Sequence, residues 1–334
     1  MATRKDVAKL AGVSVATVSN VFIGKKIVSP ELTKQVMDAA QQLNYSPNYI
    51  ARCLSLGKSH ILGIVLTDYT NPFHMEIIRG IESCARKYGY AVATFLHENC
   101  DDHEVIRPGG IQVDALMNFT VNLVSQEFLN SLMTKHTVLV DFGADNGLSF
   151  KYDHSASMER AFQRLKELGH QKIAFVSTID KNRFCLDSRG VLYAQLCKKY
   201  GFPYDENLII YSQDMSFKSE ELGYRAAAEF LARDTGATAV FVMNDMAAFG
   251  FNRGLHERGV SVPDDVSVIG FDGVNIMRYA SPGISTISLD KVTFGAEMAR
   301  LTIECIEGGK KGIGEEYVFQ STFEERESVA KAKG

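Results

Sequence analysis

The sequence predicts a small all-α head followed by a larger α/β body with parallel sheets. Over residues 1–60, apolar side chains recur at helical spacing, and a glycine separates two short helical segments. From residue 61 onward, apolar runs of strand length alternate with amphipathic runs of helix length. This alternation is typical of parallel sheets whose faces are covered by helices. A chain of 334 residues has room for two or three compact units.

The distribution of charge changes at the same boundary. The first 60 residues carry eight basic and three acidic side chains, a net charge of +5, whereas the remainder carries −9. A basic head on an acidic body indicates that the head alone meets a polyanion.

The composition argues against several classes of protein. Hydrophobic residues make up 46% of the chain and charged residues 23%, the balance of a globular protein. The sequence has no run of about 20 apolar residues and no signal-peptide core, so we expect a protein that is neither secreted nor membrane-spanning. Its six cysteines are scattered without a Cys-x-x-Cys pair, which favours reduced thiols in a cytoplasm.

The first two helices of the head are marked by their capping residues. Thr3 followed by Asp6 has the pattern of an N-cap and opens the first helix. Gly12 ends that helix at a position where a tight turn often needs a positive φ. Ser14 then caps a second helix over residues 15–22.

The order of these elements is that of a helix-turn-helix. Ala8, Gly12 and Val18 supply a small residue where the helices touch, a turn glycine and an apolar anchor in the second helix. A third helix begins at Ser29-Pro30, and its apolar face closes a small core with Val36, Ala40 and Leu43. A three-helix protein-interaction module would show the same periodicity, but the basic charges and the exposed face of the second helix favour DNA.

In a helix-turn-helix, the N-terminal part of the second helix enters the major groove. Val15 and Ala16 would contact thymine methyl groups, and Asn20 would pair with an adenine edge. Thr17, Ser19 and the lysines would hold phosphates, which fixes register without reading sequence. The DNA-contacting residues predicted in the head are Thr3, Ser14, Val15, Ala16, Thr17, Ser19 and Asn20.

Residues 46–60 read as a short hinge. Ser46-Pro47 is a helix start, but only about two turns follow before Leu56-Gly57, and so short a helix is marginal in isolation. DNA could order it, with Leu54 as an apolar wedge in the minor groove and Arg52 beside it. A linker whose Leu54 packs on the body is the alternative that these residues leave open.

The head and hinge resemble those of the lactose/galactose repressor family of transcriptional regulators. The matching segments are residues 4–14, Thr17-Val18-Ser19, Tyr45-Ser46-Pro47-Asn48 and Ala51-Arg52-x-Leu54. The resemblance implies a homodimer that binds a palindromic operator in double-stranded DNA. It also implies that two hinge helices, one per subunit, insert Leu54 at the operator's centre.

The body should contain about ten strands, which divide better into two sheets than one. The first set is expected to hold strands at Ile61–Leu66, Ala91–Leu96, Val113–Phe119 and Val138–Asp141, with a helix at Pro72–Tyr88. The second set is expected to hold a helix through Ala161–Leu168 and strands at Lys172–Ser177, Leu208–Tyr211, Ala239–Met243 and Val266–Gly270.

Polar side chains collect where these strands end, the edge at which open parallel sheets bind ligands. Asp68, Asp141, Asn244 and Asp272 could hold several vicinal hydroxyls, and Phe73 could cover a sugar ring. Each of these residues alone also fits a helix cap or a loop. Their recurrence at strand ends favours a site for a sugar or a similar polyol.

The body extends the family resemblance to the C-terminus. Arg189 stands where the family has its effector-binding arginine, and further matches are residues 244–250, 259–267, 270–272 and 325–328. The resemblance implies a body like the periplasmic sugar-binding proteins, with two lobes hinged around the effector. Effector closure would reposition the N-terminal lobes and so order or free the hinge helices.

The resulting domain prediction has three parts. Residues 1–45 form the helix-turn-helix domain, 46–60 the hinge and 61–334 the effector-binding and dimerisation body. Within the body, the N-lobe takes about 61–158 plus 291–320, and the C-lobe about 159–290 plus the C-terminal tail.

Several departures from the family pattern leave the effector's identity open. Residues 107–110 interrupt a helix, His154 replaces a commoner asparagine, residues 155–157 lack the usual glycine, and Lys291 occupies a position that is aromatic in some sugar binders. The effector could therefore be a sugar, a nucleobase or a protein corepressor. The C-terminus carries no leucine heptad, so we expect no tetramer-forming helix.

Rival classes find little support in the sequence. The Gly-Lys-Ser at 57–59 lacks the first glycine of a phosphate loop, and dinucleotide and hydrolase signatures are absent. The His, Cys and acidic residues of 97–104 match no standard metal site. We therefore expect no enzyme, cofactor or metal, and a cytoplasmic protein associated with the nucleoid. A sugar-binding protein with no role on DNA is the remaining alternative, and the head argues against it.

Overall fold

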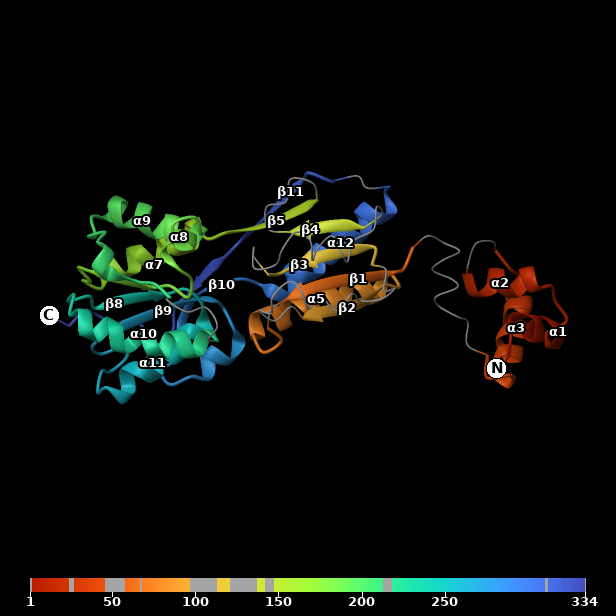
Figure 1. The fold of residues 1–334 in the computed structure, drawn as a ribbon, viewed down its shortest axis with the longest axis horizontal. Coiled ribbons are helices and arrows are strands. Elements are labelled where there is room, and N and C mark those ends of the chain that lie inside the picture. The colour runs from red at the N-terminus through yellow and green to blue at the C-terminus, as the bar shows by residue number, and fades with distance from the viewer. Residues whose placement is uncertain are drawn as a thin grey trace, which may run out of the picture.

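The computed structural model describes residues 2–23, 27–45, 58–66, 68–96, 113–120, 137–141, 147–212, 218–309 and 312–333. These residues form a three-helix head and a two-sheet α/β body, which Figure 1 shows as separate units. The predicted fold class is confirmed. The predicted contacts of Arg52 and Leu54, and the departure at 107–110, lie outside the described residues.

The head consists of α1 (Arg4–Leu10), α2 (Val15–Ile23) and α3 (Pro30–Gln42). Thr3 and Asp6 form a full capping box at the start of α1, and the Ser29 hydroxyl accepts from the Leu32 amide at the start of α3. Gly12 has a φ of +66°, as the turn was expected to need. The core that joins the three helices consists of Val7, Ala8, Val18, Val36, Ala39 and Ala40.

The first sheet of the body has the strand order β11-β5-β4-β3-β1-β2, and its neighbouring strands pair in parallel. Its strands are β1 (Ile61–Leu66), β2 (Ala91–Leu96), β3 (Ala115–Asn118), β4 (Val138–Asp141), β5 (Leu148–Asp153) and β11 (Glu316–Gln320). Helices α5 (Pro72–Lys87) and α12 (Lys291–Glu307) pack on it and on each other.

The second sheet has the order β12-β10-β9-β8-β6-β7, with only β12 antiparallel. Its strands are β6 (Ile173–Val176), β7 (Ile209–Ile210), β8 (Ala239–Val242), β9 (Ser267–Asp272), β10 (Ser285–Ser288) and β12 (Thr322–Glu324). Its helices are α7 (Ser155–Glu167), α8 (Lys181–Phe184), α9 (Ser188–Tyr200), α10 (Ser219–Arg233) and α11 (Asp245–Glu257), with 3-10 turns η2 (Glu206–Leu208) and η3 (Asn275–Tyr279).

Three segments join the two sheets. The chain crosses between β5 and α7, between β10 and α12, and between β11 and β12. Each sheet has its own hydrophobic core, so the body is two lobes connected at these crossings (Figure 1). Strands β5, β10, β11 and β12 were not anticipated from the sequence.

The helices α5 and α12 of the first lobe approach one another closely at two glycines. A Cβ atom on Gly80 would lie 2.1 Å from the Val292 carbonyl oxygen, and one on Gly295 would lie 2.1 Å from the Ile77 carbonyl oxygen. Only glycine fits at both positions, so the two helices form a tightly packed pair. Within the described part of the chain, no helix has the length and apolar character needed to span a membrane.

Candidate effector pocket and DNA-reading helix

The N-terminal end of α2 is open to solvent. Ser14, Val15 and Ala16 are exposed, and Val15 keeps 42% of its surface accessible. The Ser14 hydroxyl accepts from the Thr17 amide at 3.0 Å and lies 2.9 Å from the Thr17 hydroxyl, so it caps α2 as expected. Exposure of this turn is what major-groove reading needs, and the contacts themselves stay predictions.

The remaining head residues assigned to DNA have mixed surroundings. Ser19 and Asn20 are half-buried, one turn further along α2. Thr3 is exposed, and its hydroxyl donates to the Asp6 carboxylate at 2.7 Å. The side-chain and backbone hydrogen bonds with Thr3 lower the pKa of Asp6. The Thr3 hydroxyl is therefore already engaged in the cap of α1.

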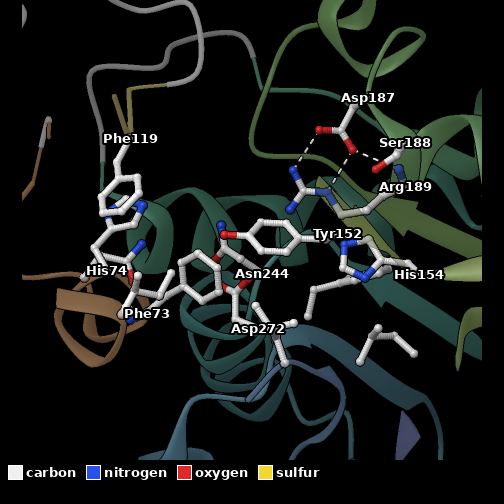
Figure 2. Close-up of a pocket in the computed structure, with 15 residues that line it drawn as sticks. Phe73, His74, Phe119, Tyr152, His154, Asp187, Ser188, Arg189, Asn244 and Asp272 are labelled. Atoms are coloured by element: carbon white, nitrogen blue, oxygen red, sulfur yellow. Dashed lines mark hydrogen bonds and ion pairs between the residues drawn. The ribbon is translucent and has the colours of Figure 1, made fainter. Parts of the chain in front are cut away.

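A pocket of about 270 Å³ lies between the two lobes at the carboxyl ends of their strands. Figure 2 shows Arg189 and Asp187 on one side, with Phe73, His74 and Phe119 opposite them. Its wall consists of Asn71, Phe73, His74, Ile77, Phe119, Tyr152, His154, Asp187, Ser188, Arg189, Asn244, Phe271, Asp272, Ile287 and Leu289.

Four of the six residues assigned to the effector from the sequence line this pocket: Phe73, Arg189, Asn244 and Asp272. Asp68 does not belong to the described wall, and its carboxylate accepts from the amide and hydroxyl of Thr70, both at 2.7 Å. Asp141 ends β4, but its side chain lies outside the described residues.

The Arg189 guanidinium is held in one orientation by Asp187. Arg189 Nε and Nη2 donate to the two carboxylate oxygens, each at 2.8 Å, and Nη1 donates to the Met243 carbonyl at 2.8 Å. Asp187 also caps α9 by accepting from the Arg189 amide at 2.9 Å. Burial raises the pKa of Asp187, but the Arg189 charge and hydrogen bonds hold it below its ordinary value. The pair is therefore ionised and fixed.

Asp272 reaches the pocket from a strained backbone. Its φ is +102°, which is costly for a residue with a side chain, and such strain is concentrated at functional sites. Burial raises the pKa of Asp272 to about 7, although the charges of Arg189 and Lys291 lower it. Asp245 lies fully buried nearby, and burial raises its pKa as well.

Aromatic rings line much of the pocket. Phe73 and Tyr152 meet edge to face with centroids 6.2 Å apart, and His74 stacks on Phe119 at 6.0 Å. On the C-lobe side, the Arg189 guanidinium lies over Phe271, 5.9 Å from the ring centroid. These faces suit a flat or ring-shaped ligand with an apolar face.

Both histidines of the pocket are neutral. Burial lowers the pKa of His74 to about 4, and burial together with the Arg189 charge lowers the pKa of His154 to about 4. His154 Nδ1 lies 3.0 Å from the Ser321 hydroxyl, whereas His74 Nδ1 is buried without a hydrogen-bond partner in the described structure.

The side chains of Asn244 and Lys291 form hydrogen bonds to the backbone around the site. Asn244 caps α11 through the Ala247 amide, at 2.8 Å, so its carboxamide oxygen is already engaged. Lys291 is only 3% exposed, and its ammonium donates to the carbonyls of Asp272, Gly273 and Leu289. The sequence suggested that Lys291 bears on effector identity, but it does not belong to the described pocket wall.

Two family models match this chain. The model for bacterial regulatory proteins of the lacI family matches residues 3–48, and that for the periplasmic binding protein-like domain matches 162–329. The HTH-type transcriptional repressor PurR of Pasteurella multocida is 31% identical over 317 residues, which is 92% of each chain. The chain belongs to the LacI family of bacterial regulatory proteins. It is a DNA-binding transcriptional regulator.

Other LacI-family proteins resemble it along most of their length. The Ribose operon repressor of Escherichia coli is 30% identical over 88% of this chain and 90% of its own. A LacI family regulator from Enterococcus faecium, solved with bound ribose, is 29% identical with a TM-score of 0.68, covering 82% of this chain and 100% of its own. The Lac repressor dimer bound to operator has a TM-score of 0.80 at 21% identity, covering 98% of this chain and 99% of its own, a likeness of fold.

Several pocket residues of this LacI-family regulator were not assigned to the effector from the sequence. Tyr152 and His154 lie at the end of β5, a strand that was not anticipated, and His154 was noted only as a departure. Asp187 reads as an ordinary helix cap, which it also is. The signal for β5 was available, because its apolar and polar residues alternate from Leu148 to Asp153. Among the described residues, no cluster of three or more potential metal ligands occurs.

Proposed function

We propose that this regulator is a repressor that binds a palindromic operator as a homodimer, with its DNA affinity set by a small effector in the interlobe pocket. The capped, solvent-facing turn at the start of α2 supports DNA reading by the head. The predicted domain limits, 1–45, 46–60 and 61–334, belong to this proposal. The effector class proposed is a neutral sugar of monosaccharide size.

The observation that best supports a sugar effector is that the pocket combines fixed hydrogen-bond donors with an available hydrogen-bond acceptor. Arg189 has five N–H groups, and three of them are engaged with Asp187 and Met243. The other two remain for a ligand, and in the described structure no group donates to the Asp272 carboxylate. A sugar hydroxyl both accepts and donates, so vicinal hydroxyls can use both residues.

Size and wall chemistry support the same class. A volume of about 270 Å³ lies just below the range of small-molecule sites, which begins at roughly 300 Å³, so the pocket suits a small ligand. Phe73 and Tyr152 can cover the apolar face of a sugar ring. The ribose named for two of the relatives supports the choice of D-ribose as the first probe.

A nucleobase is the second candidate, because the pocket's aromatic faces would also stack on a planar base. The stacked His74 and Phe119 favour it specifically. A thermal-shift comparison of D-ribose with hypoxanthine separates the two effectors. A ligand at about 100 times its Kd stabilises by roughly 2.7 kcal/mol, which raises Tm by about 5 °C for a body of this size.

The route from the pocket to the DNA-binding head can be traced along α5 and α12. Helix α5 begins at the pocket, whereas α12 begins two residues after Leu289 of the pocket wall and rises roughly 25 Å along its 17 residues. At its far end, Glu307 forms an ion pair with Lys58 at 2.9 Å and accepts from Tyr90 at 2.9 Å. Lys58 is the first described residue of the predicted hinge, 46–60, and lies near its C-terminal end, so the helix pair joins the effector site to the hinge's exit.

Removal of Arg189 tests this proposal. With Arg189→Ala, the effector response in an operator gel shift should disappear, while binding of the effector-free protein to operator should stay within about twofold of wild type. An exposed arginine of the same lobe, Arg253, which forms an ion pair with Glu257 on its own helix, supplies the control Arg253→Ala. A full effector response in Arg189→Ala would refute the site assignment.

Within the proposal, the protein binds its effector without converting it and acts on the nucleoid in the cytoplasm. The relatives named as transcriptional and operon repressors support binding over catalysis. Recovery of D-ribose unchanged after prolonged incubation is the expected result, and a new product would contradict it.

A further inference from the structure

His154 connects the pocket to two of the three segments that join the lobes. The residue lies in the crossing from β5 to α7 and lines the pocket. Its Nδ1 lies 3.0 Å from the hydroxyl of Ser321, in the crossing from β11 to β12. Ser321 in turn lies 2.6 Å from the Ser157 hydroxyl, and both serines are buried.

The hydrogens of this cluster can be assigned by counting. The Ser157 hydroxyl donates to the His154 carbonyl at 3.0 Å, so its hydrogen is not available to Ser321. The 2.6 Å contact between the two serines therefore needs the Ser321 hydrogen. Ser321 then has no hydrogen left for the imidazole, so Nδ1 must carry the proton and donate. If Nδ1 were unprotonated, one of these three contacts would have no hydrogen between its two atoms.

A competing acceptor for the Ser321 hydrogen is the Asp153 carbonyl, at the longer distance of 3.3 Å. If Ser321 donated there, it would still have no hydrogen for the imidazole. Both arrangements that keep the Ser157 donation to His154 thus place the proton on Nδ1. Because the ring is neutral, its Nε2 is then an unprotonated acceptor.

We propose that His154 is a specificity-determining residue of the effector pocket, fixed in its Nδ1–H tautomer so that Nε2 accepts a hydrogen bond from a hydroxyl of a neutral effector. The inference rests on the proposed effector function and adds to it. The pocket then holds acceptors at His154 and Asp272 and donors at Arg189. An effector with an anionic or acceptor-only group facing His154 is disfavoured, because Nε2 has no hydrogen to offer.

The same tautomer links effector contact to lobe geometry. A bond to Nε2 orients the ring, and the ring is tied through Nδ1 to Ser321 in a different crossing. Just before these crossings, the last residues of the paired strands β11 and β5 are also in contact, since Gln320 Nε2 donates to the Asp153 carboxylate at 3.0 Å. His154 therefore acts as a positioning residue for the lobes as well as a ligand contact.

The tautomer can be measured directly, without any effector. The full chain labelled with ¹⁵N-histidine gives long-range ¹H–¹⁵N spectra, and the loss of one spin system in His154→Gln assigns His154 among the eight histidines. We expect Nδ1 to resonate as a protonated nitrogen and Nε2 as an unprotonated one. Ser321→Ala removes the acceptor and should move the ring toward the Nε2–H form, whereas Ser83→Ala, on an exposed face of α5, should not. An Nε2–H ring in the wild type would overturn the proposal.

A second experiment measures the affinity of the protein for D-ribose by calorimetry. Loss of one hydrogen bond at Nε2 should weaken D-ribose binding about tenfold in His154→Phe, with no change in Ser83→Ala. Equal affinity of His154→Phe and wild type would refute the specificity role. If D-ribose failed to bind the wild type, the proposed sugar effector would be contradicted, and the tautomer measurement would still decide the assignment of His154.

Discussion

Replacement of Asp187 by alanine tests whether this carboxylate holds the pocket's arginine. The variant removes three hydrogen bonds to Arg189, at 2.8, 2.8 and 2.9 Å, and leaves the guanidinium without its counter-charge. Loss of one partner of a fully buried pair costs about 3–5 kcal/mol, and that of an exposed pair about 0–1. With side chains 19% and 24% exposed, Asp187 and Arg189 lie nearer the buried case. We expect a loss of about 2–3 kcal/mol in the free energy of unfolding.

The matched control for this variant is Asp180→Ala in the same lobe. Asp180 also caps a helix, α8, and its contact with Arg183 is long, at 3.5 Å, between side chains 43% and 47% exposed. Its replacement should cost about 1 kcal/mol, the usual value of an N-cap. The difference between the two variants in urea denaturation isolates the Arg189 pairing. If Asp187→Ala cost no more than Asp180→Ala, the claim that Asp187 fixes Arg189 would be wrong.

The Asp187 pairing also predicts a pH dependence. The pKa of Asp187 lies below its ordinary value, so the stabilisation is fully present above about pH 4 and is lost as the pH falls through the folded-state pKa. Asp187→Ala should therefore lose less stability than wild type on acidification below pH 4. D-ribose affinity should fall at least tenfold in Asp187→Ala at neutral pH, because the guanidinium is no longer oriented.

Four further predictions concern other parts of the molecule. The pKa of Asp272, raised to about 7, means that the folded state keeps a proton which the unfolded state loses above about pH 4. The resulting stabilisation should disappear as the pH rises from 4 to 7, and a wild-type stability profile no steeper than that of Asp272→Asn would contradict this. Gly80→Ala would place a Cβ atom 2.1 Å from a backbone carbonyl of α12 and should destabilise by about 2–3 kcal/mol in urea denaturation; a neutral effect would show that the helices separate freely. Glu307→Gln removes the charge that pairs with Lys58 and should reduce the ratio of operator affinities with and without effector, while effector affinity stays unchanged in calorimetry. Leu54→Ala should weaken operator binding much more than binding to random DNA in gel shifts, and equal losses would rule out the wedge role.

The head could be predicted in detail because its determinants are local. Thr3, Gly12, Ser14 and Ser29 act on residues within one turn, through capping hydrogen bonds or a positive φ. Such signals are visible in a short window of sequence. The hinge differs, since its order was expected to come from DNA, and residues 46–57 of it lie outside those described.

The strands that were not anticipated are stabilised by contacts far along the chain. Strand β10 contains Ser285 and Thr286, both fully buried, which its composition does not suggest. The Ser285 amide donates to the Ser328 hydroxyl, and the Thr286 hydroxyl donates to Asp245, at 43 and 41 residues' separation. Burial of polar side chains is possible only where such partners exist, so no local pattern could reveal this strand.

Only part of the pocket could be predicted, because some of its residues are also placed by contacts far along the chain. Asp272 ends a strand, and Phe73 and Asn244 follow strands, whose carboxyl ends face the cleft, so topology alone brings these residues near one another. The resemblance to a known family, not spacing, singled out Arg189. The orientation of a long side chain is a tertiary property, so the sequence could not show that the Lys291 ammonium would be buried against backbone carbonyls.

Lys291, the first residue of α12, holds the strained backbone at Asp272 in place. Its ammonium donates to the carbonyls of Asp272, Gly273 and Leu289 and lies 3.5 Å from the Glu76 carboxylate. These bonds tie the positive-φ segment after β9 to the first residue of α12 and to α5. The acceptor that we assign to the effector, Asp272, is thus fastened to the helix that ends at the hinge's exit. An effector that shifts Asp272 must therefore shift the start of α12, because a buried ammonium that loses its carbonyls pays a large desolvation penalty.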